Sequence, residues 1–138
     1  MKRYAVTRDI QASPEAVWSV LTDTESWPEW DPGMERVDGR FEVGSKVTFH
    51  TKMSDRAFPV KVTTLEPSRR IVLTGGMPLG LFKGERTFEL TERGDGSTRL
   101  STVEEFTGPL VRLFPIPDLQ PAFEQFADGL KSRAESAG

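Results

Sequence analysis

Between residues 34 and 107 apolar and polar side chains alternate along most of the chain, and this alternation limits the fold more than any other feature. A period of two residues is typical of strands that bury one face. Turn-forming sequences interrupt the alternation at 43–44, 54–57, 66–69, 75–80 and 93–97. The segments between them predict six strands, near 35–41, 45–53, 58–66, 69–75, 81–92 and 97–107.

Two of these turns predict which side chains share a face. Folding the chain at SDRA places Phe49 opposite Val62 and Thr51 opposite Val60. Folding it at EPSR places Val62 opposite Leu73. These residues fall on one face, and the other face collects polar residues: Lys46, Thr48, His50, Lys52, Lys61 and Thr63. The pattern predicts an antiparallel sheet with one covered and one wet face.

Helical patterns flank the strand region. Residues 3–11 alternate as a first strand, and Ser13 followed by Pro14 is typical of a helix start. A short helical turn follows in ESWPEWDP, and DLQPAFEQFADGLKSRAES has the apolar spacing of a long helix. Residues 109–117 begin a helix that Pro115 and Pro117 break.

This order of elements predicts an α+β fold. We expect a curved antiparallel sheet of six to seven strands wrapped around a long C-terminal helix, with two short helices after the first strand. We expect one domain over residues 1–138.

Composition narrows the classes of function. The net charge of -3 gives no basic footprint for nucleic acid, and the absence of cysteine excludes disulfides, thiol nucleophiles and thiolate zinc sites. No apolar segment follows the charged start, and no stretch reaches the ~18–20 apolar residues that span a bilayer. We therefore expect a cytoplasmic protein without stable membrane insertion.

One charged pair falls among apolar neighbours. A hairpin at RGDGS places Phe88 opposite Thr102 and Arg86 opposite Glu104, all on the apolar face. Charges are rarely buried unless paired. The pair is either an internal ion pair that keeps the strands in register, an anchor for a ligand oxygen, or an acid–base pair in which burial raises the pKa of Glu104.

Other catalytic chemistry has little support in the sequence. His50 is the only histidine and falls on the wet face, which argues against a metal site or a serine–histidine–aspartate triad. The glycines at 75–84 precede no helix, so they form no phosphate-binding loop. We expect no metal and no cofactor, and no residue is assigned as catalytic.

Two segments leave a choice between structure and ligand contact. The loop GGMPLGLF carries Met77 and Leu79, which either fold back onto the sheet or form a gate over an apolar ligand. Trp27 and Trp30 lie on one side of the short helical turn. Either both are core plugs, or Trp30 forms the edge of a cavity.

The segments ASPEAVWSVLTDTESWPEWDP and FADGLKSRAE, in this order of elements, resemble the START-like helix-grip (SRPBCC) superfamily. The polyketide cyclase/dehydrase-like bacterial branch is the most similar in pattern, and the resemblance covers essentially the whole chain. It implies a mostly apolar cavity between the concave face of the sheet and the last helix. The superfamily includes lipid carriers, aromatase/cyclases, hormone receptors and chaperone-activating domains, and TGG at 74–76 resembles a loop of the abscisic-acid receptors.

The leading hypothesis is that the chain binds a hydrophobic or aromatic small molecule, lipid-like or polyketide-like, in this cavity. The expected ligand contacts are Trp30, Phe49, Thr51, Val60, Val62, Leu73, Met77, Leu79, Arg86, Phe88, Thr102, Glu104, Phe123 and Phe126. One alternative is a cofactor-independent cyclase, aromatase or dehydratase that uses Arg86 and Glu104. Another is a protein-interaction or chaperone-activator module.

Overall fold

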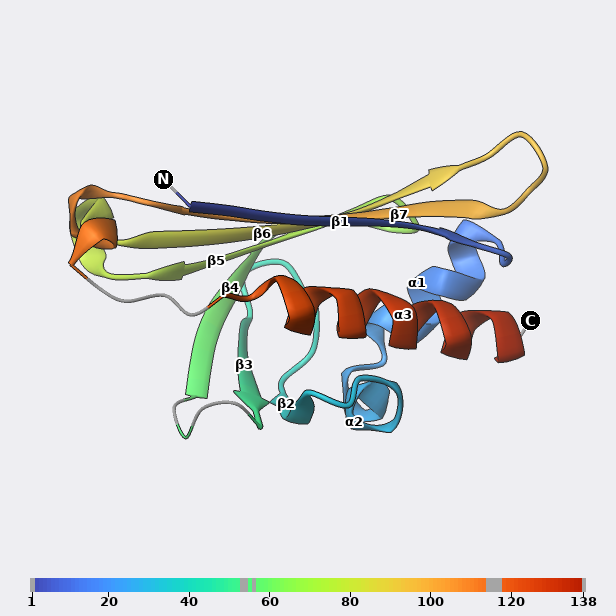
Figure 1. The fold of residues 1–138 in the computed structure, drawn as a ribbon, viewed down its shortest axis with the longest axis horizontal. Coiled ribbons are helices and arrows are strands. Elements are labelled where there is room, and N and C mark those ends of the chain that lie inside the picture. The colour runs from blue at the N-terminus through green and yellow to red at the C-terminus, as the bar shows by residue number, and fades with distance from the viewer. Residues whose placement is uncertain (1, 53–54, 56, 114–117, 138) are drawn as a thin grey trace.

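The computed structural model describes residues 2–52, 55, 57–113 and 118–137. Seven antiparallel strands form one sheet in the order β1-β7-β6-β5-β4-β3-β2. The strands are β1 (Lys2–Ile10), β2 (Met34–Asp38), β3 (Lys46–Thr51), β4 (Ala57–Glu66), β5 (Arg70–Gly76), β6 (Lys83–Glu92) and β7 (Thr98–Thr107). The sheet curls so that β2, β3 and β4 turn down beside the long C-terminal helix (Figure 1).

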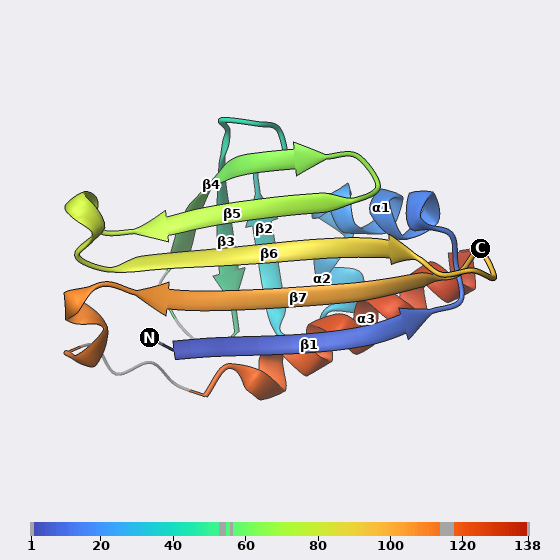
Figure 2. The ribbon, with the colours of Figure 1, turned by 90° about the horizontal axis from the view of Figure 1, so that it is seen from above.

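Capping residues mark the starts of the two longest helices. They are α1 (Pro14–Thr22), η1 (Thr24–Ser26), α2 (Trp27–Trp30), η2 (Pro78–Gly80), η3 (Pro109–Arg112) and α3 (Gln120–Ala137). The side chain of Ser13 accepts a hydrogen bond from the Ala16 amide at 3.2 Å, as an N-cap does. Asp118 accepts one from the Gln120 amide at 3.1 Å where α3 begins. The expected α+β helix-grip arrangement is confirmed, and α3 crosses beneath the strands (Figure 2).

No helix among the described residues is long and apolar enough to cross a membrane. The expected break at Pro115 and Pro117 lies outside the described residues, whereas the preceding Pro109–Arg112 forms the turn η3.

The hairpin between β6 and β7 has the predicted register. Arg86 pairs with Glu104, and Phe88 pairs with Thr102. The expected pairing of Val62 with Leu73 between β4 and β5 is also confirmed. A shift between Val62 and Thr64 then marks a β-bulge, which adds a local bend to β4.

The register predicted between β3 and β4 is wrong. Phe49 pairs with Phe58 instead of Val62, and Val60 pairs with Val47 instead of Thr51. Thr51 instead pairs with Met34 of β2. Each error is four positions, an even number, so the same side chains stay on the concave face.

Strand β2 ends three residues earlier than predicted. Gly39 has a φ of 102°, and a Cβ there would lie 2.7 Å from the carbonyl oxygen of Lys46. Only glycine fits this close approach, so the chain leaves the ladder after Asp38. Phe41 still returns to the core at 6% exposure.

Aromatic rings fill one half of the space between sheet and helix. Trp27 is fully buried, and its ring centroid lies 5.2–6.4 Å from those of Trp30, Phe41, Phe49, Phe88 and Phe126. Its indole nitrogen donates a hydrogen bond to the carbonyl of Leu21 at 2.9 Å. This cluster joins α2, α3 and the sheet into one core.

Exposure rises along the concave face away from this cluster. In the closed half the residues are almost inaccessible: Val62, Leu73, Phe88, Leu90 and Leu100. In the open half, as we call it below, they are partly exposed: Tyr4, Thr51, Val60, Arg86 and Glu104. The strands β6 and β7, which carry Arg86 and Glu104, continue past the first turn of α3 toward η2 and η3 (Figure 1).

Candidate functional site

Arg86 lies where the closed half of the concave face meets the open half. Its guanidinium carbon is 4.6 Å from the ring centroid of Phe88 on the same strand. From α3 below, the rings of Phe123 and Phe126 lie at 4.3 Å and 4.7 Å. Three aromatic faces therefore surround one cation, an arrangement that stabilises a desolvated guanidinium.

The hydrogen bonding of Arg86 is incomplete. Its Nε donates to Thr102 Oγ1 at 3.2 Å, but its Nη2 is buried and has no hydrogen-bond partner among the described residues. Glu104 is its neighbour in register, yet no ion pair among the described residues joins the two side chains. A buried donor without an acceptor is costly. The geometry thus differs from a satisfied internal ion pair.

Two carboxyl groups add to the electrostatics of the site. Burial raises the pKa of Glu104, and the positive charge of Arg86 opposes that shift. Burial also raises the pKa of Asp31. The hydrogen bond from the Gly33 amide and the positive charges of Arg86 and Lys52 oppose this rise. Burial in turn lowers the pKa of Arg86, while both carboxyl groups raise it. One arginine therefore interacts electrostatically with two partly desolvated acids.

Asp31 is the site residue that sequence reasoning missed. It ends α2 and is only 5% exposed. The Gly33 amide donates to its carboxylate at 3.1 Å, so the sequence Asp-Pro-Gly forms an Asx-turn. The sequence Asp-Pro-Gly after Trp30 signals this turn but not the interaction of Asp31 with Arg86.

A second buried polar atom lacks a partner. Thr51 Oγ1 on β3 has no hydrogen bond among the described residues. Thr51 follows Phe49, which packs against Trp27 at 5.4 Å between ring centroids, just as Arg86 precedes Phe88 in the same cluster. Both unsatisfied atoms thus border the aromatic core on the side of the open half.

The other expected ligand contacts are divided between three environments. Trp30, Phe49, Val62, Leu73, Phe88, Thr102, Phe123 and Phe126 are buried, at 8% exposure or less. Val60 is partly exposed in the open half. Met77 and Leu79 are 43% and 96% exposed, so they project from the η2 loop and do not fold back onto the sheet. The buried apolar residues of this set belong to the hydrophobic core, and the ring of Phe123 also lies over the guanidinium of Arg86.

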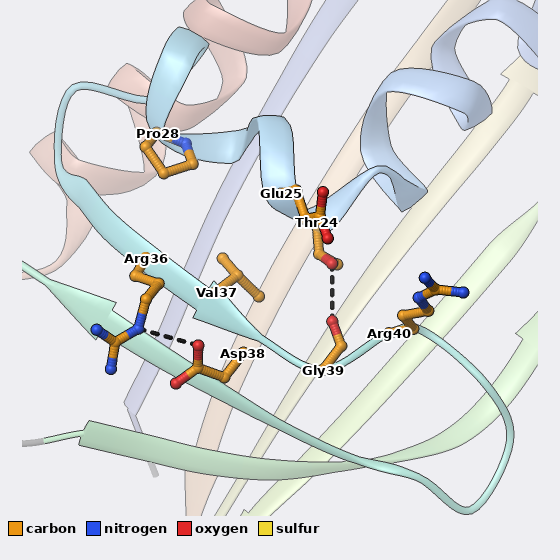
Figure 3. Close-up of a pocket in the computed structure, with 8 residues that line it drawn as sticks. All are labelled: Thr24, Glu25, Pro28, Arg36, Val37, Asp38, Gly39 and Arg40. Carbon is orange, nitrogen blue, oxygen red and sulfur yellow. Dashed lines mark hydrogen bonds and ion pairs between the residues drawn. The ribbon is translucent and has the colours of Figure 1, made fainter.

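Two pockets on the surface are lined by residues outside the Arg86 site. One of about 400 Å³ lies between η1, α2 and β2 (Figure 3), lined by Thr24, Glu25, Pro28, Arg36, Val37, Asp38, Gly39 and Arg40. The second, of about 340 Å³, shares Thr24, Glu25 and Arg40 with it. Neither contains a residue from the expected ligand contacts.

His50 lies on the outer face of the sheet, as expected. Its Nε2 is 2.9 Å from Asp38 and 3.3 Å from Arg36, which itself donates to Asp38 at 2.9 Å. Hydrogen bonds from Arg36 and His50 lower the pKa of Asp38. This exposed cluster is separate from the Arg86 site.

The Glu104→Gln variant is expected to be more stable than the parent protein at mildly alkaline pH, and equally stable in acid. The raised pKa means that the folded protein holds a proton that the unfolded chain has already released. The parent's free energy of unfolding therefore falls as pH rises from the ordinary glutamate pKa through the folded one, and glutamine removes this loss. Urea unfolding over a pH series measures it. Lower stability of the variant at every pH would contradict this account.

Comparison with known proteins places nearly the whole chain in one family. The family described as "Polyketide cyclase / dehydrase and lipid transport" matches residues 1–135. A Penicillium oxalicum protein named "Oxopyrrolidines biosynthesis cluster protein O" is 28% identical over 173 aligned positions, covering 96% of this chain and 86% of that protein.

Solved structures of low identity share the fold. A START superfamily protein from Mycobacterium smegmatis superposes with a TM-score of 0.72 at 22% identity, covering 99% of each chain. A protein from Mesorhizobium loti superposes with a TM-score of 0.76 at 20% identity, again covering 99% of each chain.

Proposed function

Because the chain belongs to the polyketide cyclase/dehydrase and lipid transport family, we propose that it binds an apolar or aromatic small molecule in the open half of the concave face. The walls would come from the partly exposed Val60 and Tyr4 and from the ring of Phe123. The aromatic cluster around Trp27 would form the floor. Ligand sites of this kind are mostly apolar with a few polar groups that fix orientation.

The unsatisfied Nη2 of Arg86 carries the proposal. A buried cationic donor without an acceptor is destabilising, so its retention calls for an acceptor that arrives with a ligand. The ligand would place a carbonyl, hydroxyl or carboxylate oxygen at this atom. Thr51 Oγ1 could serve a second polar group of the same molecule.

The three phenylalanine rings favour a planar apolar body beside this oxygen. Phe88, Phe123 and Phe126 already surround the guanidinium, so a flat ligand can extend the same stack toward the open half. An aromatic ketone meets both requirements, because it combines a planar ring system with one strong acceptor.

The test compares the mass of the purified protein under native and denaturing conditions, before and after addition of 2-acetylnaphthalene. We expect either a co-purified apolar compound or a saturable complex with this aromatic ketone. Absence of both, with the protein folded by circular dichroism, would contradict the proposal.

A second candidate function is a cofactor-independent cyclase or dehydratase. The observation that favours it is the pair of buried carboxyl groups, Glu104 and Asp31, because burial raises the pKa of each, the direction that a general acid or base needs. Arg86 would stabilise an enolate oxygen while one carboxyl group moves the proton. The Penicillium oxalicum relative is named for a biosynthesis cluster, which agrees with such a role.

The recovered ligand discriminates between the two functions. A carrier returns the compound unchanged, whereas an enzyme returns a cyclised or dehydrated product. For an enzyme, Glu104→Gln should abolish conversion while the complex still forms. Conversion that survives this substitution would remove Glu104 from the mechanism.

A further inference from the structure

The acceptor that Nη2 of Arg86 lacks would bind beside two acidic side chains. Glu104 is the partner of Arg86 in register, and opposed residues of an antiparallel pair have Cβ atoms about 4.5–5.5 Å apart. Asp31 is buried and interacts electrostatically with Arg86. We propose that these two acids restrict the ligand to one with a neutral oxygen acceptor and, when ionised, exclude its carboxylate analogue. This inference rests on the proposed function and narrows the class of ligand.

The turn that carries Asp31 is fixed on both sides. The Asp31 amide donates to the Trp27 carbonyl at 2.8 Å, and the Asp31 carbonyl accepts from the Met34 amide at 3.0 Å. A Cβ at Gly129 of α3 would clash with the carbonyl oxygen of Trp30, so glycine permits this close approach. The turn is therefore held against α3, which limits how far Asp31 can withdraw when a ligand enters.

The position of Glu104 is fixed by the sheet. It lies on β7, between Arg86 of β6 and Tyr4 of β1, and shares the concave face with both. No ion pair in the described part of the chain joins Glu104 to a cation. The charge of an ionised Glu104 is thus not cancelled by direct contact, and it acts on whatever binds beside Arg86.

The aromatic surroundings of the guanidinium strengthen these electrostatic effects. The ring centroids of Phe88, Phe123 and Phe126 lie 4.3–4.7 Å from its central carbon, and Nη2 is buried. An oxygen that binds Nη2 leaves water, and charges interact more strongly there than in solvent. A carboxylate would meet one positive and two negative charges at this place. A carbonyl oxygen carries no net charge and avoids the repulsion.

Other charged groups around the site alter this balance little. Lys52, which follows β3, is exposed, so solvent screens its attraction for the buried acids. On α3, Glu124 and Asp128 pair with Arg8 at 3.7 Å and 2.7 Å. Strand β5 places the uncharged Leu73 opposite the arginine. The two acids therefore determine how the site responds to a ligand's charge.

The exclusion of carboxylates depends on pH. Burial raises the pKa of Glu104 and of Asp31, so both ionise at higher pH than exposed carboxyl groups do. A simple carboxylic acid has a pKa of about 4 and is ionised above about pH 5. As pH rises further, the ligand's charge stays constant while the site gains negative charge. The affinity for a carboxylate therefore falls, and the affinity for a neutral ketone changes less.

The experiment is calorimetric titration with 2-acetylnaphthalene and with 2-naphthoate, from about pH 5 to about pH 9. The two probes share one ring system and differ in the polar group. At the alkaline end we expect 2-naphthoate to bind about tenfold more weakly than the ketone, or weaker still, and the gap should narrow as pH falls. Glu104→Gln should tighten 2-naphthoate binding at the alkaline end. Asp31→Asn should do the same, and its amide oxygen can still accept from Gly33.

Glu105 provides a matched control. It follows Glu104 on β7 and pairs with Glu85, so its side chain points to the outer face. Glu105→Gln removes the same charge from the same strand and should leave both affinities unchanged. Circular dichroism checks that each variant is folded.

The two proposals fail in different ways. If the ketone binds and 2-naphthoate binds as tightly at the alkaline end, this inference is overturned and the proposed function stands. Weak 2-naphthoate binding that neither Glu104→Gln nor Asp31→Asn improves would assign the exclusion to other groups and also overturn it. Failure of both probes to bind at any pH would overturn the proposed function, and this inference with it.

Discussion

The Arg86→Met variant is expected to fold and to bind an aromatic ketone about ten- to a hundredfold more weakly than the parent. Hydrogen bonds to charged groups contribute about 1.5–3 kcal/mol, and each 1.4 kcal/mol is about tenfold in affinity. At a pH where Glu104 and Asp31 are protonated in the folded protein, the free energy of unfolding should stay close to the parent's, because the lost guanidinium has one unsatisfied donor. At higher pH it should fall below the parent's, because the two carboxyl groups lose the cation that opposes their raised pKa values. Titration calorimetry and urea unfolding measure the two effects.

Arg36→Met is the matched control for this variant. The Arg36 side chain is 62% exposed on the outer face of the sheet, so its loss should not change ligand affinity. Arg86→Lys should retain part of the affinity, because lysine keeps the charge but lacks the planar fork. If Arg86→Met fails to fold, Arg86 has a structural role. If the variant folds and binds the ketone as well as the parent does, the ligand site lies elsewhere.

The Trp27→Ala variant is expected to lose about 3–5 kcal/mol of stability, the range for truncation of a large buried aromatic residue. Trp27 is fully buried and contacts five other rings, and its indole donates to the carbonyl of Leu21. Total stabilities of small proteins are only about 5–15 kcal/mol, so this loss threatens folding itself. Urea unfolding monitored by far-ultraviolet circular dichroism measures the change.

Trp18 supplies the comparison within the same chain. It lies on α1, is only partly buried and packs against the margin of the core. Trp18→Ala should therefore cost clearly less than Trp27→Ala. Equal losses from the two substitutions would mean that the ring cluster around Trp27 is not the centre of the core.

Local turn chemistry made part of this fold predictable. The short RGDGS turn determines the pairing of Arg86 with Glu104, because a hairpin loop of known length leaves one register. The capping pair Ser13 and Pro14 likewise determines where α1 begins. In both cases the residues that carry the information lie within a few positions of each other.

Other features of the fold depend on contacts between residues far apart in the sequence, which the alternation of apolar and polar residues does not encode. Alternation is unchanged when a strand slips by an even number of residues, so it could not select Phe58 over Val62 as the partner of Phe49. Asp31 and Arg86 are 55 positions apart, so their electrostatic interaction arises only in the folded protein and no local motif indicates it. The apolar residues Met77 and Leu79 looked equally suited to a core and to a gate, and their exposure became evident only in three dimensions.

A crystal structure of the protein with bound 2-acetylnaphthalene tests the central claim most directly. The account predicts the ring system in the open half of the concave face, with its carbonyl oxygen about 3 Å from Nη2 of Arg86. A ligand that occupies the surface pocket between η1 and β2, with Nη2 still lacking an acceptor, would contradict it.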